Sequence, residues 1–406
     1  MSLSQIARNI GQSATLKLNE TAALMRQKGE PVIHLGGGEP KSKPPLDALV
    51  SAAALLNSGE VRYTPPDGTP ALKQAIVRYT EEFYGRKLGV RQVMASSGAK
   101  QAIMVALQAI LDPQDEVIYP VPYWVSYPEM VRLVGAVPVP VRTEDGRFEP
   151  TLRDIEQHVT SYTKAVILNS PNNPSGAVYS RDFIGEVVQF CEAKNLYLIM
   201  DDIYHRLIFD GRKPTSCYEL AKNDSESSRI IIINGVSKQY AMTGFRIGWA
   251  ASHNTKLIEA MTNIQGHQTS GPSGLLQHAA LGALNGVQSS VDSLRLTLEN
   301  SRNVLVERLR AFAGVRLEVP GGTFYSFPNF SAYEKSSVKL AELLLQRVKV
   351  VTVPGVEFGL EGHLRLSFCG SIRDIREGIE RIKWALDPNA PNELTIGERR
   401  LVRDWS

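Results

Sequence analysis

The chain has 406 residues, of which 43% are hydrophobic and 21% are charged, and its formal net charge is +3. This length allows a large core and two domains, and the composition is that of a globular protein. The small, dispersed positive charge provides no argument for nucleic acid or an anionic membrane as a partner.

The cysteines and the N-terminus indicate where the protein works. Cys191, Cys217 and Cys369 lie far apart and without CxxC spacing, which argues against a disulfide framework or a zinc site and fits a reducing compartment. The N-terminal segment "MSLSQIARNIGQSATLKLNE" has no long apolar core and no small-residue cleavage site, so we predict no signal peptide. The longest apolar runs, such as "LYLIM" and "IIII", have the length of strands rather than of membrane spans. We therefore expect a cytoplasmic protein.

The first part of the chain predicts an arm and then an alternation of helices and strands. Residues 1–45 are predicted to form the arm, with the glycine-rich turn "HLGGGEPKSKPP", and to join a small domain. The segment "GTPALKQAIVRYTEEFYG" predicts a helix with Thr69 as its cap, Pro70 in its first turn and Gly85 at its end. The short runs "DEVIYP", "KAVILN", "LYLIM" and "RIIIING" are typical of strands buried on both faces. Residues 46–289 therefore predict a large α/β domain with a mainly parallel sheet.

Beyond this region the pattern changes. The segment "SVDSLRLTLENSRNVLVERLRAF" predicts one long amphipathic helix, and shorter strands between helices follow it. We predict a smaller α+β domain over residues 290–388. Residues 389–406 form a polar, proline-bearing tail, which we interpret as a surface extension.

Polar side chains follow three of the predicted strands. Asp201 and Asp202 come after "LYLIM", the cluster "NSPNNPSG" follows "KAVIL", and Lys238 follows "RIIIING". Ligands of parallel α/β sheets bind beyond the carboxyl ends of the strands. Taken singly, these residues are also explained as loop acids, turn residues and a surface lysine. A desolvated lysine, in contrast, loses its proton more easily and becomes a nucleophile for a carbonyl group.

A fourth signal precedes a predicted helix. The small residues Ser96, Ser97, Gly98 and Ala99 leave backbone N–H groups available for an anion at the helix N-terminus. The segment has neither the Walker lysine motif nor the dinucleotide fingerprint, so it indicates a phosphate rather than a nucleotide. The phosphate cradle, the asparagine cluster, the aspartate and the lysine occur in this order. Together they predict a lysine-bound cofactor with a phosphate and a basic ring nitrogen, which is pyridoxal phosphate.

The chain then shows a resemblance to a known family. The segment "GVSKQYAMTGFRIG" is similar throughout to the lysine signature of the class I aminotransferases, which are pyridoxal-phosphate enzymes of fold type I. The resemblance covers about residues 15–388 and includes "YTPPDGTPAL", "GAKQA", "PYWVSYPEM", "NSPNNPSGAVY" and "DDIY" in the family's order. It is greatest to the bacterial aspartate aminotransferases of the "PYWVSYPEM" type. It implies a large cofactor-binding domain with a sheet of the seven-stranded type, a smaller α+β domain and a homodimer with shared active sites.

The resemblance also implies roles for individual residues. Lys238 would form the Schiff base and carry the proton between the substrate Cα and the cofactor C4′. Asp201 would pair with the pyridinium nitrogen, and Tyr204 would hydrogen-bond the phenolic oxygen of the ring. The other implied cofactor contacts are Gly98, Ala99 and Lys100 through their N–H groups, Trp124 by stacking, Asn173, Arg246 at the phosphate, and Tyr63 from the partner subunit.

For the substrate, the resemblance implies Arg365 as the arginine that binds the α-carboxylate through two hydrogen bonds. Lys100 would contact the distal carboxylate of an acidic substrate. The remaining implied substrate contacts are Gly38, Trp124, Asn173 and the arm residues Ser13 and Thr15. We therefore expect a ping-pong aminotransferase with aspartate and glutamate as donors and 2-oxo acids as acceptors.

Several positions depart from the family pattern. The segment "GGGEPKSKPP" replaces the usual "GEPDFDTP", Phe245 stands where tryptophan is usual, and Asp202 stands where glutamate is usual. Gly11 stands where some relatives that use prephenate have lysine, which lowers prephenate as a substrate. These departures keep alternatives open: aromatic, alanine-type, kynurenine-type or specialised aminotransferases, and C–S lyases. A ligand sensor fused to a DNA-binding module and a cofactor-free lysine aldolase are weaker alternatives.

Overall fold

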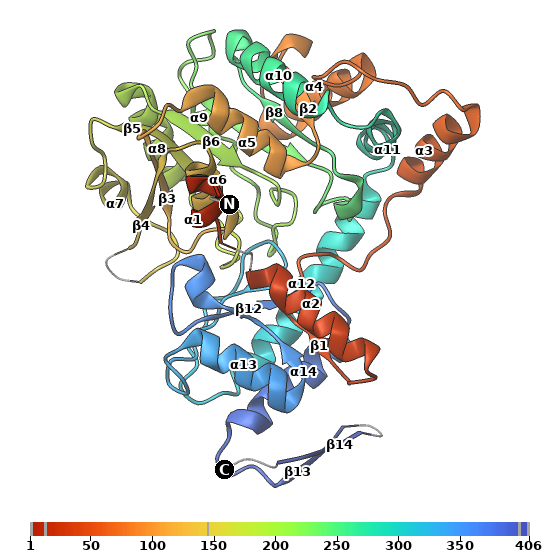
Figure 1. Ribbon diagram of the computed structural model, residues 1–406, viewed down its shortest axis with the longest axis vertical. Coiled ribbons are helices and arrows are strands. Elements are labelled where there is room, and N and C mark those ends of the chain that lie inside the picture. The colour runs from red at the N-terminus through yellow and green to blue at the C-terminus, as the bar shows by residue number, and fades with distance from the viewer. Residues whose placement is uncertain (1–2, 12–13, 144–145, 397–398, 404–406) are drawn as a thin grey trace.

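The computed structural model describes residues 3–11, 14–143, 146–396 and 399–403 (Figure 1). Its centre is a seven-stranded sheet with the strand order β2-β8-β7-β6-β5-β3-β4. The strands from β7 to β4 are parallel, and β8 runs antiparallel to both of its neighbours. This confirms the mainly parallel sheet. The strand bounds are β2 Val93–Ser96, β3 Glu116–Pro120, β4 Val137–Val141, β5 Thr163–Asn169, β6 Tyr197–Asp201, β7 Ile230–Gly235 and β8 Gly248–Ala251.

Alternate residues of the central strands serve opposite faces of the sheet. Ile230 and Ile232 of β7 belong to a core shared with α4, α8 and α11, whereas Ile231 and Ile233 pack with α5, α6 and α10. A strand covered on both faces has no solvent side, which explains why these runs lack a polar alternation. The helices of this part are α3 Leu46–Ser58, α4 Pro70–Tyr84, α5 Ala99–Ile110, α6 Ser126–Leu133, α7 Leu152–Glu156, α8 Arg181–Lys194, α9 Cys217–Leu220, α10 Thr255–Thr269 and α11 Gly274–Asn285, with short 3-10 turns at η1 Val90–Gln92 and η2 Thr243–Phe245.

Helix α4 begins and ends where its sequence predicts. The Thr69 side chain accepts a hydrogen bond from the backbone N–H of Leu72, and Pro70 is the first helical residue. Gly85 ends the helix in the left-handed conformation, with φ of 63°. Tyr79 and Tyr84 of this helix are buried toward the sheet.

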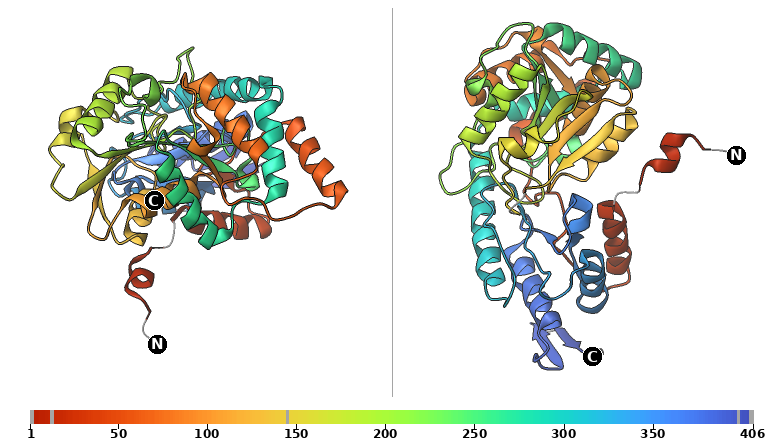
Figure 2. Two further views of the ribbon diagram at one scale, coloured as in Figure 1. Left: turned by 90° about the horizontal axis from the view of Figure 1, so that it is seen from above. Right: turned by 90° about the vertical axis from the view of Figure 1, so that its left-hand side faces the viewer.

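A second core lies below the sheet in Figure 1. Helix α12 (Ser289–Leu309), the predicted long helix, reaches from the sheet-bearing part into this second part (Figures 1 and 2). The N-terminal segment contributes a strand here, because β1 (Ile33–His34) pairs in parallel with β10 (Val350–Val351). The remaining elements here are α2 Ala14–Gln27, β9 Tyr325–Ser326, α13 Ser337–Val348, β11 Val353–Pro354, η3 Gly355–Phe358, β12 Leu364–Ser367 and α14 Ile372–Leu386. Helix α1 (Gln5–Asn9) lies apart from this second part, toward the N-terminus that extends outward in Figure 2. The domain boundaries drawn from the sequence stay a prediction.

The tail has more structure than the sequence indicated. Strands β13 (Glu393–Ile396) and β14 (Arg399–Val402) form an antiparallel hairpin at the lower end of the molecule (Figure 1). Arg403 donates to the carbonyl of Asp387 at 2.9 Å, and the Trp384 indole N–H donates to Pro391 at 2.7 Å. These contacts attach the hairpin to the end of α14. In the described residues, no helix combines the length and apolarity that crossing a membrane requires.

Candidate active site

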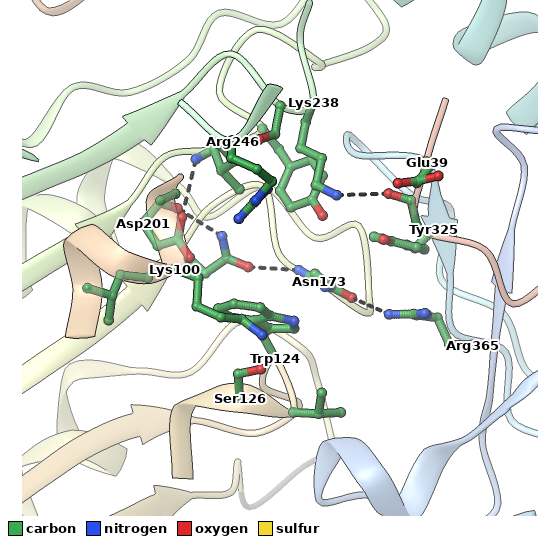
Figure 3. Close-up of a pocket in the computed structure, with 18 residues that line it drawn as sticks. Glu39, Lys100, Trp124, Ser126, Asn173, Asp201, Lys238, Arg246, Tyr325 and Arg365 are labelled. Carbon is green, nitrogen blue, oxygen red and sulfur yellow. Dashed lines mark hydrogen bonds between the residues drawn. The ribbon is translucent and has the colours of Figure 1, made fainter. Parts of the chain in front are cut away.

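A cavity of about 450 Å³ lies at the carboxyl ends of β5, β6 and β7, where the sheet meets the second part of the chain (Figure 3). It is the place where an open α/β sheet binds its ligands. Most of the predicted site residues line it, although they come from segments far apart in the sequence. They are Gly38, Ala99, Lys100, Trp124, Asn173, Asp201, Tyr204, Lys238, Arg246 and Arg365.

Lys238 lies in the loop that follows β7, with its ammonium group in the cavity. Its Nζ donates a hydrogen bond to the carbonyl of Gly38 at 2.8 Å. Burial lowers the pKa of Lys238 to about 8, and the nearby charges of Arg365 and Arg246 act in the same direction. A lysine with this pKa is partly neutral near physiological pH, so its amine can attack a carbonyl carbon.

Asp201 ends β6 as a fully buried carboxyl group. Burial raises its pKa to about 6, and three contacts oppose that rise: the Tyr127 hydroxyl, the Ile203 N–H and the charge of Lys238. The Tyr127 hydroxyl donates to Asp201 Oδ2 at 2.7 Å. The side-chain amide of Asn169 donates to the Asp201 carbonyl at 2.8 Å. The carboxyl group is therefore held in one orientation, ready to accept a hydrogen bond from a cationic nitrogen.

The start of α5 forms a cradle for an anion. Gly98 caps this helix without a side chain and has φ of 93°. A Cβ atom on Gly98 would lie 2.4 Å from Arg246 Nη2, and one on Gly248 would lie 2.3 Å from the backbone nitrogen of Ala99. Glycine at both positions lets the Arg246 guanidinium and β8 approach the helix N-terminus. Backbone N–H groups, the helix dipole and a guanidinium together suit a phosphate.

Arg365 lies on β12 and provides a buried cation on the other side of the cavity. It donates from Nη1 to Asn173 Oδ1 at 3.1 Å and from Nη2 to the carbonyl of Gly36 at 3.0 Å. Its guanidinium carbon lies 4.3 Å from the ring centre of Tyr325. Within the described part of the chain, its Nε has no hydrogen-bond partner and no carboxylate forms an ion pair with it. A ligand carboxylate would complete these contacts.

Lys100 supplies a further cation beside Trp124. Its Nζ lies 4.9 Å from the centre of the Trp124 ring. Lys100 is an exposed residue at the mouth of the cavity, and partial desolvation there lowers its pKa, as does the charge of Arg246. Among the described residues, no carboxylate pairs with this ammonium group. Beside Lys238 and Arg246, the cavity thus offers two further cations, Lys100 and Arg365.

Four predicted contacts lie elsewhere or cannot be placed. Gly98 lies behind Arg246 rather than at the cavity wall. Tyr63 is 96% exposed and does not line the cavity of its own chain. Ser13 lies outside the described residues, as does the side chain of Thr15, whose backbone belongs to α2.

Several residues that we did not predict contribute to the site, among them the aromatic residues Tyr127 and Tyr325. Tyr127 follows Trp124 by three residues, and the two rings meet edge to face with centres 5.5 Å apart. That spacing, within "PYWVSYPEM", was a signal for a second inward-facing aromatic residue. Tyr325 lines the cavity from β9, and nothing in its local sequence indicates this. The other unpredicted lining residues are Glu39, Ile103, Val125, Ser126, Asn169, Ile203 and Ser237.

The positions that depart from the family pattern do not form new cavity walls. Lys41 Nζ lies 2.9 Å from Asp374 Oδ2 at the start of α14, so its charge is directed away from the cavity. Phe245 packs against the core of the sheet-bearing part. Asp202 is buried behind Asp201, and burial raises its pKa well above its usual range.

The arrangement fits pyridoxal phosphate at each of its polar groups. The helix N-terminus with Arg246 suits the phosphate, Asp201 suits a protonated ring nitrogen, and Lys238 suits the aldehyde carbon. No group of three or more histidine, cysteine, aspartate or glutamate side chains within the described ranges is placed to hold a metal ion. Fold and cavity together define a pyridoxal-phosphate enzyme of fold type I.

Comparison with known proteins identifies the family. The model of "Aminotransferase class I and II" matches residues 30–382, and the chain belongs to this family. It is 37% identical to the aspartate aminotransferase of Geobacillus stearothermophilus over 398 residues, which cover 96% of this chain and 100% of the relative. It is 38% identical to the aspartate aminotransferase of Thermotoga maritima over 372 residues, or 91% of this chain and 96% of that one. The structure of Thermus thermophilus aspartate aminotransferase with maleate has a TM-score of 0.90 at 35% identity and covers 95% of this chain and 100% of that one. The protein is an aminotransferase, and pyridoxal phosphate is its cofactor.

Proposed function

We propose that this aminotransferase exchanges an amino group between aspartate or glutamate and a 2-oxo acid, with oxaloacetate and 2-oxoglutarate as the acceptors. The observation that carries the proposal is the pair of cations, Arg365 and Lys100, neither of which pairs with an acidic side chain among the residues that the structure describes. Figure 3 shows Lys100 beside Trp124 and Arg365 on the far side of Asn173. A dicarboxylic substrate would satisfy both cations. The names of the relatives, which are aspartate aminotransferases, support this choice.

The bound cofactor would supply an electron sink for the negative charge that develops at the substrate Cα. Arg365 would bind the α-carboxylate through two parallel hydrogen bonds and so orient the Cα. Lys238, with its lowered pKa, would take the Cα proton as a general base and return it as a general acid. Asp201 would keep the proton on the ring nitrogen, assisted by the hydrogen bond from Tyr127.

Further contacts would hold the cofactor in place. Trp124 would cover one face of the ring, Tyr204 and Asn173 would contact its phenolic oxygen, and Arg246 would bind the phosphate. Burial raises the pKa of Tyr204 well above its usual value, so its hydroxyl stays a hydrogen-bond donor. Donor and acceptor would use one set of groups in turn, which is a ping-pong cycle.

We also infer a homodimer in which each site is completed by the partner. Tyr63 is 96% exposed, which is unusual for a large aromatic side chain, and helix α3, which precedes it in the chain, also exposes apolar side chains. Leu46, Val50 and Leu56 on α3 are 73%, 57% and 59% exposed. Such a surface favours a partner subunit, whose Tyr63 would reach the phosphate. We further expect the protein to work in the cytoplasm, where its free thiols would stay reduced.

The test of substrate choice compares aspartate with alanine as amino donors. The two share an α-carboxylate, but only aspartate has a distal one. We expect Lys100→Ala to lower kcat/KM for aspartate ~10-fold to 100-fold, since one charge-assisted contact is lost. The value for alanine should stay within about twofold. Equal losses for both donors would refute the dicarboxylate proposal and favour one of the other aminotransferase activities.

A further inference from the structure

Four buried polar side chains form a closed ring directly behind the loop that carries Lys238. They are Tyr79 on α4, His205 in the turn after β6, Asn234 in β7 and Gln239, which follows Lys238 in the chain. Their exposed fractions are 3%, 3%, 0% and 0%. None of them lines the cavity. Buried polar groups of this kind must satisfy one another, because water cannot.

The direction of the hydrogen bonds in this ring follows from which imidazole nitrogen of His205 carries the proton, and Nδ1 also lies 3.2 Å from the Asp202 carbonyl. Asn234 Nδ2 lies 3.0 Å from His205 Nδ1, and only the amide can donate there if the imidazole carries its proton on Nε2. His205 Nε2 then donates to the Tyr79 hydroxyl oxygen at 2.9 Å, and that hydroxyl donates to Gln239 Oε1 at 3.1 Å. Gln239 Nε2 donates back to Asn234 Oδ1 at 3.4 Å. With the His205 proton on Nε2, every member donates to the next in one direction around the ring.

This direction requires a neutral imidazole. Burial lowers the pKa of His205 to about 3, and the charge of Arg206 lowers it further, so the ring stays uncharged in the physiological range. Hydrogen bonds in a closed chain of one direction polarise one another and strengthen. Removal of one member would leave two buried groups without their partner.

The ring holds the lysine loop at both of its ends. Asn234 Oδ1 accepts from the backbone N–H of Gly235 at 2.7 Å, and Gln239 Nε2 donates to the Gly235 carbonyl at 3.2 Å. Lys238 therefore lies next to Gln239 in a short loop whose two ends, at Gly235 and Gln239, are joined by hydrogen bonds of the ring. His205, for its part, directly follows Tyr204 and lies in the turn that begins at Asp201.

We propose that Tyr79, His205 and Gln239 are positioning residues that set the place of the Lys238 amine relative to Asp201. They act through the two loops that carry these groups and touch neither substrate nor cofactor. The inference rests on the proposed role of Lys238 as the lysine that binds the cofactor and moves the proton. Proton transfer depends steeply on position, so a small shift of the loop would reduce turnover without affecting the grip on the substrate carboxylate.

The test is the Tyr79→Phe variant, assayed as the holoenzyme with saturating pyridoxal phosphate. It removes the hydroxyl and keeps the ring that packs against Trp249, with centres 5.3 Å apart. We expect kcat to fall ~10-fold to 100-fold and KM for aspartate to stay within about twofold. We also expect the pH midpoint of the visible absorption of the bound cofactor to shift by about half a pH unit or more, since that midpoint reports the surroundings of Lys238.

Tyr218→Phe is the matched control. Tyr218 is also buried, and its hydroxyl donates to the Ala251 carbonyl at 3.0 Å, at the end of β8 remote from the lysine loop. The control should lose similar thermal stability but keep the wild-type kcat and spectral midpoint. If both variants show the same kcat and the same midpoint, the ring is merely structural and the proposal is wrong. Should Tyr79→Phe fail to fold, Gln239→Met breaks the same ring and is judged by the same criteria.

The failure of this inference can be told apart from failure of the proposed function. Lys238→Ala should lose the visible band of the lysine-bound cofactor, whatever the ring does. If Lys238→Ala keeps that band, the role of Lys238 is refuted and the ring proposal is refuted with it. If the band is lost but Tyr79→Phe matches its control, only the ring proposal is refuted.

Discussion

The two sides of the cavity are built in different ways. On one side, Asn169 and Asp201 end two adjacent strands of one sheet and the Lys238 loop follows a third, so the ladder of β5, β6 and β7 sets their spacing. On the other side, Gly38 and Arg365 come from chain segments more than three hundred residues apart. The sheet side holds the groups proposed for chemistry, together with Lys100 on α5, which is proposed to bind the distal carboxylate. The other side holds Arg365, which is proposed to bind the α-carboxylate. Side chains at the end of a sheet are held in precise positions by the strand ladder. Side chains from loops of a second part can vary between enzymes with different substrates.

The largest expected effect concerns the sheet side. We expect Lys238→Ala to lower kcat by ~10⁴-fold or more, because the general acid–base group is lost. The matched control is Lys41→Ala, which removes a lysine near the cavity whose charge pairs with Asp374. Steady-state rates with aspartate and 2-oxoglutarate would show the difference. A variant without Lys238 that keeps a substantial rate would contradict the division between the two sides.

The next prediction separates the two carboxylates at the end of β6. We expect Asp201→Asn to lower kcat ~100-fold or more, since it removes the charge opposite the ring nitrogen. Asp202→Asn should change kcat only a few-fold, because burial raises the pKa of Asp202 well above its usual range and so favours the neutral carboxyl group, which asparagine resembles. Rates and bound cofactor would be measured for both. Equal losses of kcat in both variants would contradict a specific role for the Asp201 carboxylate.

A substitution of Arg365 should weaken substrate binding and leave the bound cofactor unchanged. We expect Arg365→Lys to lower kcat/KM ~10-fold to 100-fold for aspartate and for alanine alike, because the paired hydrogen bonds to the α-carboxylate are lost. The visible spectrum of the bound cofactor without substrate should stay that of the wild type. A loss confined to aspartate would reverse the roles that we propose for Arg365 and Lys100.

The smallest effect is a pH dependence of the cofactor-free protein. The pKa of Lys238 is about 8 when folded and 10.5 in the free side chain, so between these values the unfolded chain binds more protons. Stability should therefore rise with pH from about 8 to about 10.5, by up to ~3 kcal/mol. Below pH 8 the buried Lys238 is protonated, and the full cost of burying its charge reduces the stability of the folded protein. Urea unfolding of wild type and Lys238→Met near both limits would measure it, and a constant difference between the two would contradict the lowered pKa.

The same contrast explains what the sequence could predict. Strand ends are local features, so "LYLIM" followed by Asp201 and "RIIIING" followed by Lys238 were sufficient to place both groups at one edge. Tyr325 could not be found, because its approach to Arg365 depends on how β9 pairs with β12. The ring of Tyr79, His205, Asn234 and Gln239 joins three distant segments, and no spacing predicts it. The hairpin of the tail was missed because its strands have only four residues each and follow a segment rich in proline and asparagine.

The most direct test of the account is a spectral titration of the purified protein with pyridoxal phosphate. We predict a violet absorption band from the lysine-bound cofactor, which aspartate removes and 2-oxoglutarate then restores. Alanine should remove the band only at much higher concentration, because it lacks the carboxylate that Lys100 would bind. A protein that gains no band with pyridoxal phosphate, or whose band ignores aspartate, would contradict the account.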